Sequence, residues 1–212
     1  MKNLLLCSSF ADIADQLTDF FAIIHAKSVQ NVAFIEVASH VESYKDYIEQ
    51  AKKAFQQHGI AIEIVDFSQS SDNMIHQLQR NDLIYISGGN TFYLLHMLNE
   101  KQLTKVIIDL IDNGKPYIGE SAGAIILSKD IGYVKNIDDA EKAPNLANFK
   151  ALDIIDFYPL PHFDNPPFRA SAHQIVNEWQ EKIPLMAFNN NQAIWVLGKS
   201  IILKNGKTHA SF

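Results

Sequence analysis

The sequence has little of what characterises several large classes of proteins. It contains a single cysteine, Cys7, so no disulfide can form within the chain, and we expect a buried thiol in a reducing compartment. Acidic residues outnumber basic ones by 24 to 18, the net charge is −6, and no Lys/Arg cluster occurs, which argues against a nucleic-acid partner. No apolar run approaches the roughly 20 residues of a membrane span, and the apolar start at residues 4–6 is too short for a signal peptide.

Motifs for metals and nucleotides are also missing. We find no HExxH sequence, no paired cysteines and no cluster of His and Asp, so we expect neither a metal site nor a cofactor. The composition is otherwise that of a globular protein, with 47% hydrophobic and 20% charged residues in 212 residues. We therefore expect one cytoplasmic domain over residues 1–212, with no nucleic-acid or membrane partner.

What the sequence does contain is an alternation of short apolar runs with segments of helical periodicity. The predicted strands are 4–8, 31–37, 60–67, 82–86 and 116–118, and helices are predicted between them. Strands that are apolar throughout predict an α/β fold, with a mainly parallel sheet covered by helices on both faces. Later segments predict a polar surface loop at 135–145, an apolar strand within 151–160, a helix at 169–180, and a C-terminal β-hairpin with strands at 193–197 and 201–204 and a turn at Asn205-Gly206.

The sequence Gly119-Glu120-Ser121-Ala122-Gly123 matches the G-x-S-x-G pattern of a nucleophile elbow. It joins an apolar strand to a small-residue helix start, and its glycines remove side chains that would collide with the neighbouring strand or helix. Ser121 is therefore the candidate nucleophile. The alternative is an ordinary tight turn, because Gly and Ser also form turns.

A serine nucleophile needs a base and a group that orients the base. Of the eight histidines we single out His162, because Pro161 and the following proline-rich turn constrain its backbone. Its alternative role is to hydrogen-bond the loop. The orienting acid is expected at Asp139 or Asp138 in the loop between Ser121 and His162, although that pair could be a solvated acidic turn. The competing acids are Asp153, Asp156 and Asp164.

The turn Ser87-Gly88-Gly89-Asn90 follows another predicted strand. Parallel strands bind ligands beyond their carboxyl ends, so this turn is expected near the elbow. Gly88 and Gly89 would let a backbone N–H approach an oxyanion, and the N–H of Ala122 would supply a second donor. The alternative, a phosphate-binding turn, lacks the Lys-Ser/Thr of a P-loop and the spacing of a dinucleotide fingerprint.

Three motifs together resemble the dipeptidase E (aspartyl dipeptidase) family of serine peptidases, relatives of cyanophycinase with a class I glutamine amidotransferase-like fold. They are the segments 87–92, 119–123 and 158–163, with the sequences SGGNTF, GESAG and YPLPHF. The resemblance implies Ser121 as nucleophile, His162 as base, and an oxyanion hole formed by Gly89 and Ala122. It also implies Asp139 as the acid, with Asp138 next.

We also expect Gly88 and Asn90 of the glycine turn to bind substrate. Two features depart from the aspartyl dipeptidase. Arg169 is the candidate for its substrate-binding arginine but stands slightly out of step with that position, and Glu120 is an acid beside the candidate nucleophile. If its carboxylate faced the pocket, it would repel an aspartate side chain and favour a positive group such as a free α-amino terminus.

We therefore expect a serine-type peptidase that hydrolyses short peptides, as a monomer or a homodimer. Two alternatives stay open: an amidase or esterase with the same triad, and a non-catalytic relative that binds a small molecule.

Overall fold

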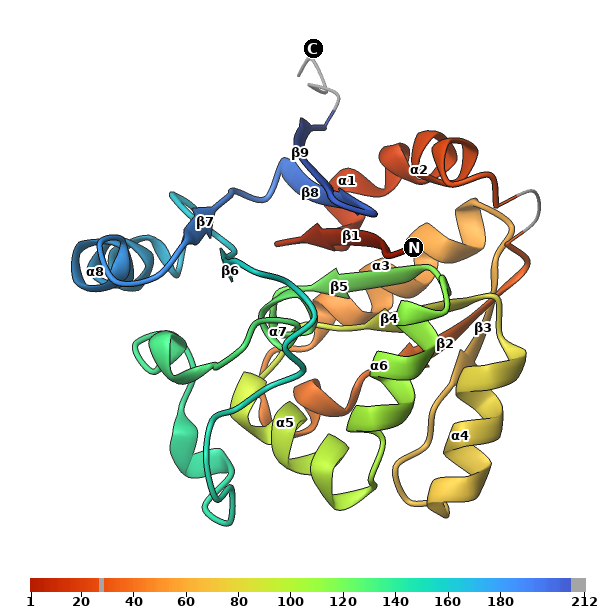
Figure 1. Ribbon diagram of the computed structural model, residues 1–212, viewed down its shortest axis with the longest axis horizontal. Coiled ribbons are helices and arrows are strands. Elements are labelled where there is room, and N and C mark those ends of the chain that lie inside the picture. Colours follow the sequence, from red (N-terminus) through yellow and green to blue (C-terminus); the bar gives the residue numbers. More distant parts are fainter. Residues whose placement is uncertain (27–28, 207–212) are drawn as a thin grey trace.

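The computed structural model describes residues 1–26 and 29–206, and its centre is a seven-stranded sheet with the order β3-β2-β4-β5-β1-β8-β9 (Figure 1). A smaller parallel pair, β6-β7, lies beside it. The strands are β1 (Asn3–Cys7), β2 (Asn31–Ile35), β3 (Ala61–Ile64), β4 (Leu83–Ile86), β5 (Tyr117–Glu120), β6 (Tyr158–Leu160), β7 (Leu185–Ala187), β8 (Gln192–Leu197) and β9 (Ser200–Asn205).

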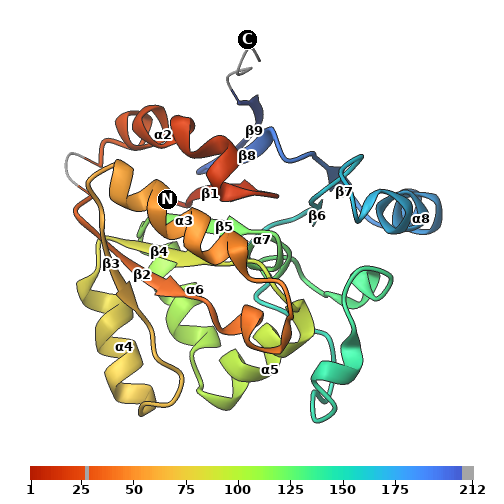
Figure 2. The same ribbon diagram turned by 180° about the vertical axis from the view of Figure 1, so that it is seen from behind.

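Helices cover both faces of the sheet, as the views from the front and from behind show (Figures 1 and 2). One face carries α1 (Phe10–Ile13), α2 (Leu17–Ile23) and α3 (Asp46–Gln57), and the other carries α4 (Ser71–Arg80), α5 (Thr91–Glu100), α6 (Thr104–Asp112) and α7 (Ala122–Ile125). Helix α8 (Arg169–Trp179) lies beside β6 and β7 (Figure 1). The prediction of a mainly parallel α/β fold is confirmed.

The strand order brings three chain turns to one edge of the sheet. β5 pairs in parallel with β4 on one side and with β1 on the other, and Gly119 lies opposite both Ile86 and Leu6. Because parallel strands end at the same edge, the residues after β1, β4 and β5 meet there. The glycine turn and the elbow are thus neighbours, as their positions after strands predict.

Aromatic side chains pack helices α1 and α3 against the sheet next to these strand ends. On the face under α1 and α3, the rings of Phe10 and Phe55 stack at 4.5 Å and those of Phe34 and Tyr85 approach to 4.5 Å. All four side chains are fully buried. Burying such rings contributes strongly to stability, because each removes a large apolar area from water.

The C-terminal hairpin is confirmed, but its turn was predicted at the wrong place. β8 pairs with β9 so that Leu197 lies opposite Ser200, which puts the turn at Gly198-Lys199 rather than at Asn205-Gly206. Gly198 has φ of +63°, a conformation that glycine adopts without strain, so the tight turn forms there. β8 runs antiparallel to β1 and places the hairpin at the edge of the sheet.

The apolar stretch 151–160 forms a strand only over β6. Its first half instead covers the end of α7, where Leu152 N–H donates to Ile126 O and Ile154 N–H to Leu127 O. The polar stretch 135–145 contains the short 3₁₀ turn Ala140–Lys142 and otherwise has no regular structure, as expected for a loop.

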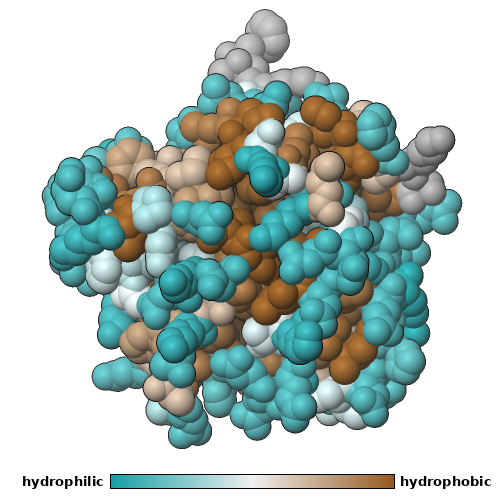
Figure 3. Space-filling view, viewed as in Figure 1, coloured by the Kyte–Doolittle hydropathy of each residue, from teal (hydrophilic) through white to brown (hydrophobic). Residues whose placement is uncertain are grey.

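The surface carries a few large apolar side chains at the free edge of the sheet. In Figure 3 apolar surface gathers over the region of β8 and β9, where Ile201 is 48% and Leu203 is 46% exposed. Within residues 1–26 and 29–206, no helix combines the length and the apolar character needed to cross a membrane. The prediction of one domain over 1–212 includes residues 207–212, which lie outside the described part of the chain.

Candidate active site

Ser121 stands at the sharp turn between β5 and α7. Its φ of +48° and ψ of −106° are unusual for a residue with a side chain, and such a conformation costs about 1–3 kcal/mol. Its N–H donates to Cys7 O at 2.8 Å, which holds the turn against β1. A Cβ on Gly119 would overlap the backbone of Gly123, and a Cβ on Gly123 would overlap Ile86 O, so this crossing requires both glycines.

His162 lies next to Ser121 although the two are far apart in sequence. Its Nε2 is 3.0 Å from Ser121 Oγ, a hydrogen-bonding distance. The backbone of His162 is left-handed, with φ of +60°, and its N–H donates to Ser8 Oγ at 2.9 Å. The ring of Phe168 lies 4.9 Å from the imidazole. The histidine is therefore held at its backbone, at its ring face and at both ring nitrogens.

The second ring nitrogen of His162 meets an amide rather than a carboxylate. Nδ1 is 2.9 Å from Asn190 Oδ1, and Asn190 N–H in turn donates to Asn165 Oδ1. If Nδ1–H donates to this oxygen, Nε2 carries a lone pair and accepts the hydroxyl proton of Ser121. Burial lowers the pKa of His162 and the hydrogen bond to Asn190 partly offsets this, so the imidazole is neutral at neutral pH.

The structure does not bring the expected acids to His162. Asp139 is exposed and its Oδ1 accepts from Glu141 N–H, which caps a turn of its own loop. Asp138 Oδ2 accepts from both the N–H and the hydroxyl of Thr91. A carboxylate at the start of α5 is stabilised by the helix dipole, so Asp138 anchors its loop to that helix and does not orient the base.

The other acids of this region also have different neighbours. Asp164 Oδ1 lies 2.8 Å from His173 Nε2, while Asp153 and Asp156 are exposed. Among the described residues, Asn190 is the side chain that meets Nδ1 of His162. The prediction of Asp139 or Asp138 at this position therefore disagrees with the geometry.

Two backbone N–H groups lie free at the carboxyl ends of β4 and β5. Gly89 N–H and Ala122 N–H donate no hydrogen bond to any group in the described ranges. Gly89 has φ of +130°, and a Cβ there would overlap the backbone of Ala38. Only glycine fits this position, and the arrangement leaves two donors for a developing negative charge.

Glu120 does not face the substrate side of Ser121, contrary to the conditional expectation. It is 2% exposed; Oε1 accepts from Phe10 N–H at 2.8 Å and Oε2 from the Tyr85 hydroxyl at 2.5 Å. Gly88 N–H also donates to this carboxylate. Burial raises the pKa of Glu120 to about 7, against the lowering effect of these bonds. Glu120 therefore joins β5 to the start of α1 and to β4 beneath Ser121.

The remaining predicted binding residues serve the framework. Asn90 caps α5, where its Oδ1 accepts from Tyr93 N–H, and its Nδ2 donates to Asp139 O. Arg169 donates through Nε and Nη2 to Asp164 O. Gly88 alone of this set faces the nucleophile: a Cβ on it would lie 3.3 Å from Ser121 Cβ.

Sequence reasoning missed Asn190, Ser8 and Tyr47. Asn190 follows β7 as Ser8 follows β1, so a search for polar residues just after every predicted strand would have found both. Our search for an orienting group was limited to acids, which excluded an amide. Tyr47 sits in α3, with its ring edge 3.5 Å from where a Gly88 Cβ would be, and no sequence pattern points to it.

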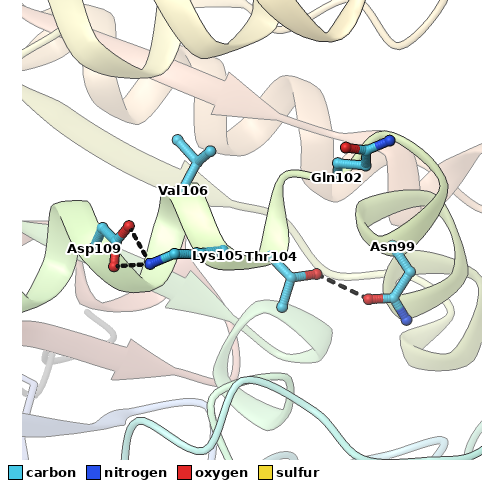
Figure 4. A pocket seen from close by; sticks show the side chains of 6 residues that line it. All are labelled: Asn99, Gln102, Thr104, Lys105, Val106 and Asp109. Atoms are coloured by element: carbon cyan, nitrogen blue, oxygen red, sulfur yellow. Dashed lines mark hydrogen bonds and ion pairs between the residues drawn. The ribbon is translucent and has the colours of Figure 1, made fainter.

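The open hollow between α5 and α6 is a different feature. It has a volume of about 500 Å³, and Lys105 there binds both oxygens of Asp109 while Thr104 donates to Asn99 (Figure 4). Its lining residues are Asn99, Gln102, Thr104, Lys105, Val106 and Asp109. It contains none of the residues described above, so the candidate site is the edge where β1, β4 and β5 end.

Comparisons with known proteins find similar chains. The model of a family described as Peptidase family S51 matches residues 4–204. An uncharacterized peptidase of Listeria monocytogenes is 42% identical over 205 residues, which are 96% of this chain and 98% of that protein. A peptidase E of Nostoc sp. is 32% identical over 170 residues, 77% of this chain and 66% of that protein. A crystal structure of a Listeria monocytogenes protein superposes with a TM-score of 0.90 at 41% identity, covering 97% of this chain and 98% of that one.

Proposed function

Because the chain belongs to peptidase family S51 and is a peptidase, we propose that it is a serine peptidase that cleaves short peptides through Ser121, His162 and Asn190. The observation that carries this proposal is one continuous line of hydrogen bonds. It runs from Ser121 Oγ to His162 Nε2 at 3.0 Å, and from His162 Nδ1 to Asn190 Oδ1 at 2.9 Å. The non-catalytic alternative does not fit membership of a peptidase family.

The proposed reaction proceeds in two steps. Ser121 Oγ attacks the scissile carbonyl as His162 takes its proton, and the oxyanion accepts from Gly89 N–H and Ala122 N–H. The imidazolium returns the proton to the leaving amine, which departs and leaves an acyl-enzyme. Water then attacks the ester, again with His162 as base, and releases the acid and free Ser121.

An amide in the third position has a definite consequence. Asn190 orients the imidazole through its oxygen, but it does not place a negative charge beside the imidazolium, as a carboxylate would. A neutral orienting amide occurs in papain-like Cys-His-Asn sites, so the arrangement is compatible with acyl transfer. The pKa of His162 is lowered by burial, so we expect the base to remain active somewhat below its usual pH range.

The test is covalent labelling of the full chain with a fluorophosphonate. We expect one phosphonyl adduct, located on Ser121 by mass spectrometry, together with loss of dipeptide hydrolysis. Ser121→Ala should give no adduct and His162→Ala should slow labelling by about 10²–10⁴-fold, the usual contribution of a general base. Asp156→Asn, at an exposed acid away from the line of hydrogen bonds, is the matched control and should label at the wild-type rate. A wild-type protein that forms no Ser121-dependent adduct would falsify the proposal.

A further inference from the structure

Tyr47 of α3 lies beside Ser121, and the ring of Tyr44 lies next to that of Tyr47. The Tyr47 ring edge and Ser121 Cβ flank the same point, the position of a Gly88 Cβ, at 3.5 and 3.3 Å. Gly88 has no side chain, so no side chain of that residue stands between the tyrosine ring edge and the serine. The Tyr44 ring lies 6.0 Å from the Tyr47 ring, and Tyr44 is 61% exposed. We call these two side chains the tyrosine shelf.

Tyr47 offers its ring, not its hydroxyl, to the tyrosine shelf. The hydroxyl is buried and has no hydrogen-bond partner in the described part of the chain. Because it has essentially no exposed surface, a substrate does not reach it. An exposed tyrosine ring such as that of Tyr44 offers apolar area with little conformational freedom to lose.

The charges that act on the Tyr47 hydroxyl are negative. Burial, and then the carboxylates of Glu120, Glu42 and Asp138, raise the pKa of the Tyr47 hydroxyl. A carboxylate arriving on a substrate side chain would add another like charge in a region partly shielded from water, which is unfavourable.

Among the described contacts, neither arginine of the chain touches the tyrosine shelf. The two arginines are Arg80 and Arg169. Arg80 pairs with Glu63 beside the edge strand β3, and Arg169 donates to Asp164 O. Lys45, next to Tyr44 in sequence, has its ammonium 3.5 Å from His40 O. Acidic side chains usually need a bidentate arginine for tight recognition, and none is positioned for it here.

We propose that the tyrosine shelf binds the acyl-side residue of the substrate, and that the enzyme cleaves peptides with an uncharged apolar or aromatic residue there in preference to aspartate. The inference rests on the proposed serine peptidase function and extends it to the substrate class. The apolar side chain packs on the rings of Tyr44 and Tyr47. The resemblance to aspartyl dipeptidases thus extends to the reaction but not to the preferred residue.

The first experiment compares kcat/KM for Phe-Leu, Leu-Leu and Asp-Leu with the full chain. We expect the two apolar dipeptides to be cleaved at least about tenfold more efficiently than Asp-Leu, because placing an uncompensated charge is strongly disfavoured. Equal values, or a preference for Asp-Leu, would overturn the inference. Hydrolysis of any of them with labelling of Ser121 leaves the proposed function intact, whereas no labelling and no hydrolysis overturns the function itself.

The second experiment tests the shelf directly. Tyr44→Ala should lower kcat/KM for Phe-Leu by about three- to tenfold, the range expected when an aromatic pair is lost, and should change that for Asp-Leu much less. Tyr44→Phe keeps the ring and should behave as wild type, and the labelling rate of Ser121 should be equal in all three proteins. Tyr44 is exposed, so the fold tolerates both changes. Parallel losses on both substrates, or no loss on Phe-Leu, would show that the ring does not select the side chain.

Discussion

A triad acid normally does two things: it orients the histidine, and it places a negative charge beside the imidazolium. At the scale of single residues, only the first of these is found beside His162. Asn190 orients His162 through its oxygen, while the nearest acidic loop is occupied elsewhere: Asp138 binds Thr91 and Asp139 caps its own turn. The sequence points to Ser121 and His162 as the proposed nucleophile and base, because Ser121 stands in a glycine-flanked turn after a strand and His162 in a proline-constrained turn after another. It does not identify the orienting group, because an asparagine in a loop has no distinctive pattern.

Replacing Asn190 should reveal its role through the pH profile. Asn190→Asp places a carboxylate against Nδ1, which favours the charged imidazolium and raises the pKa of His162 by about 1–3 units. A base with a raised pKa is protonated over a wider range, so the acid limb of kcat/KM against pH should move upward by the same amount. Asn190→Ala should instead lower kcat by about 10²-fold or more at every pH, since the imidazole loses its orientation.

Asp139→Asn is the matched control for that prediction. It replaces an acid by an amide, the reverse of Asn190→Asp, and Asp139 is the residue that the family resemblance implies as the triad acid. We expect kcat within about twofold of wild type, as for a surface substitution. A loss of orders of magnitude in Asp139→Asn, with Asn190→Ala near wild type, would return the orienting role to the acidic loop.

At the scale of elements, the candidate site lies at the edge of the sheet where the parallel strands β1, β4 and β5 end. The periodicity of the sequence predicts these strands, so the elbow and the glycine turn could be placed together before any coordinates were known. The segment 151–160 could not be predicted in the same way: its apolar residues cover α7 rather than continuing a strand, and an apolar run does not distinguish the two. The hairpin turn was misplaced because Gly198 and Gly206 are equally plausible turn residues in the sequence alone.

Contact between α7 and β4 is close enough that one methyl group should disturb it. In Gly123→Ala the new Cβ would overlap Ile86 O, and we expect the free energy of unfolding to fall by about 1–3 kcal/mol as the backbone shifts. The shift moves Ala122 and Ser121, so fluorophosphonate labelling should also slow. Chemical denaturation and labelling rates measure the two effects.

Gly59→Ala provides the control for this prediction. Gly59 has φ of +72° with open space around its Cβ position, so alanine costs about 1–2 kcal/mol of backbone strain without a collision. We expect reduced stability but an unchanged labelling rate. If Gly123→Ala also labels at the wild-type rate, α7 does not need its close approach to β4 to position the nucleophile.

At the scale of the whole molecule, two carboxyl groups, the buried Glu120 and the half-buried Asp138, tie the elements around the site together. Glu120 joins the aromatic core at Tyr85 to the start of α1, and Asp138 fastens the 135–145 loop to α5. Burial raises the pKa of Glu120 to about 7 and that of Asp138 to about 6. Ionisation of Glu120 and Asp138 therefore lowers the stability of the folded protein. The sequence does not indicate this property, because it does not show which carboxyl groups are shielded from water.

The pH dependence of stability should show this cost. Because the pKa of Glu120 is higher in the folded protein than in the unfolded chain, the folded state binds more protons between about pH 4.5 and pH 7. The stabilising contribution is complete below this window and is lost as the pH rises through it. For a rise of this size the loss amounts to about 3 kcal/mol. Glu120→Gln imitates the protonated group and keeps an acceptor for Phe10 N–H, so it should not suffer the loss.

Urea denaturation of both proteins at pH 4.5 and at pH 8 measures the difference. We expect similar free energies of unfolding at pH 4.5 and a more stable Glu120→Gln variant at pH 8. Glu178→Gln, an exchange at an exposed position on α8, should change the two values equally. A constant difference between wild type and Glu120→Gln across this range would mean that Glu120 ionises equally easily in the folded and unfolded states. The carboxylate would then be adequately stabilised by Tyr85 and the backbone N–H groups, and the buried link beneath Ser121 would carry no pH-dependent cost.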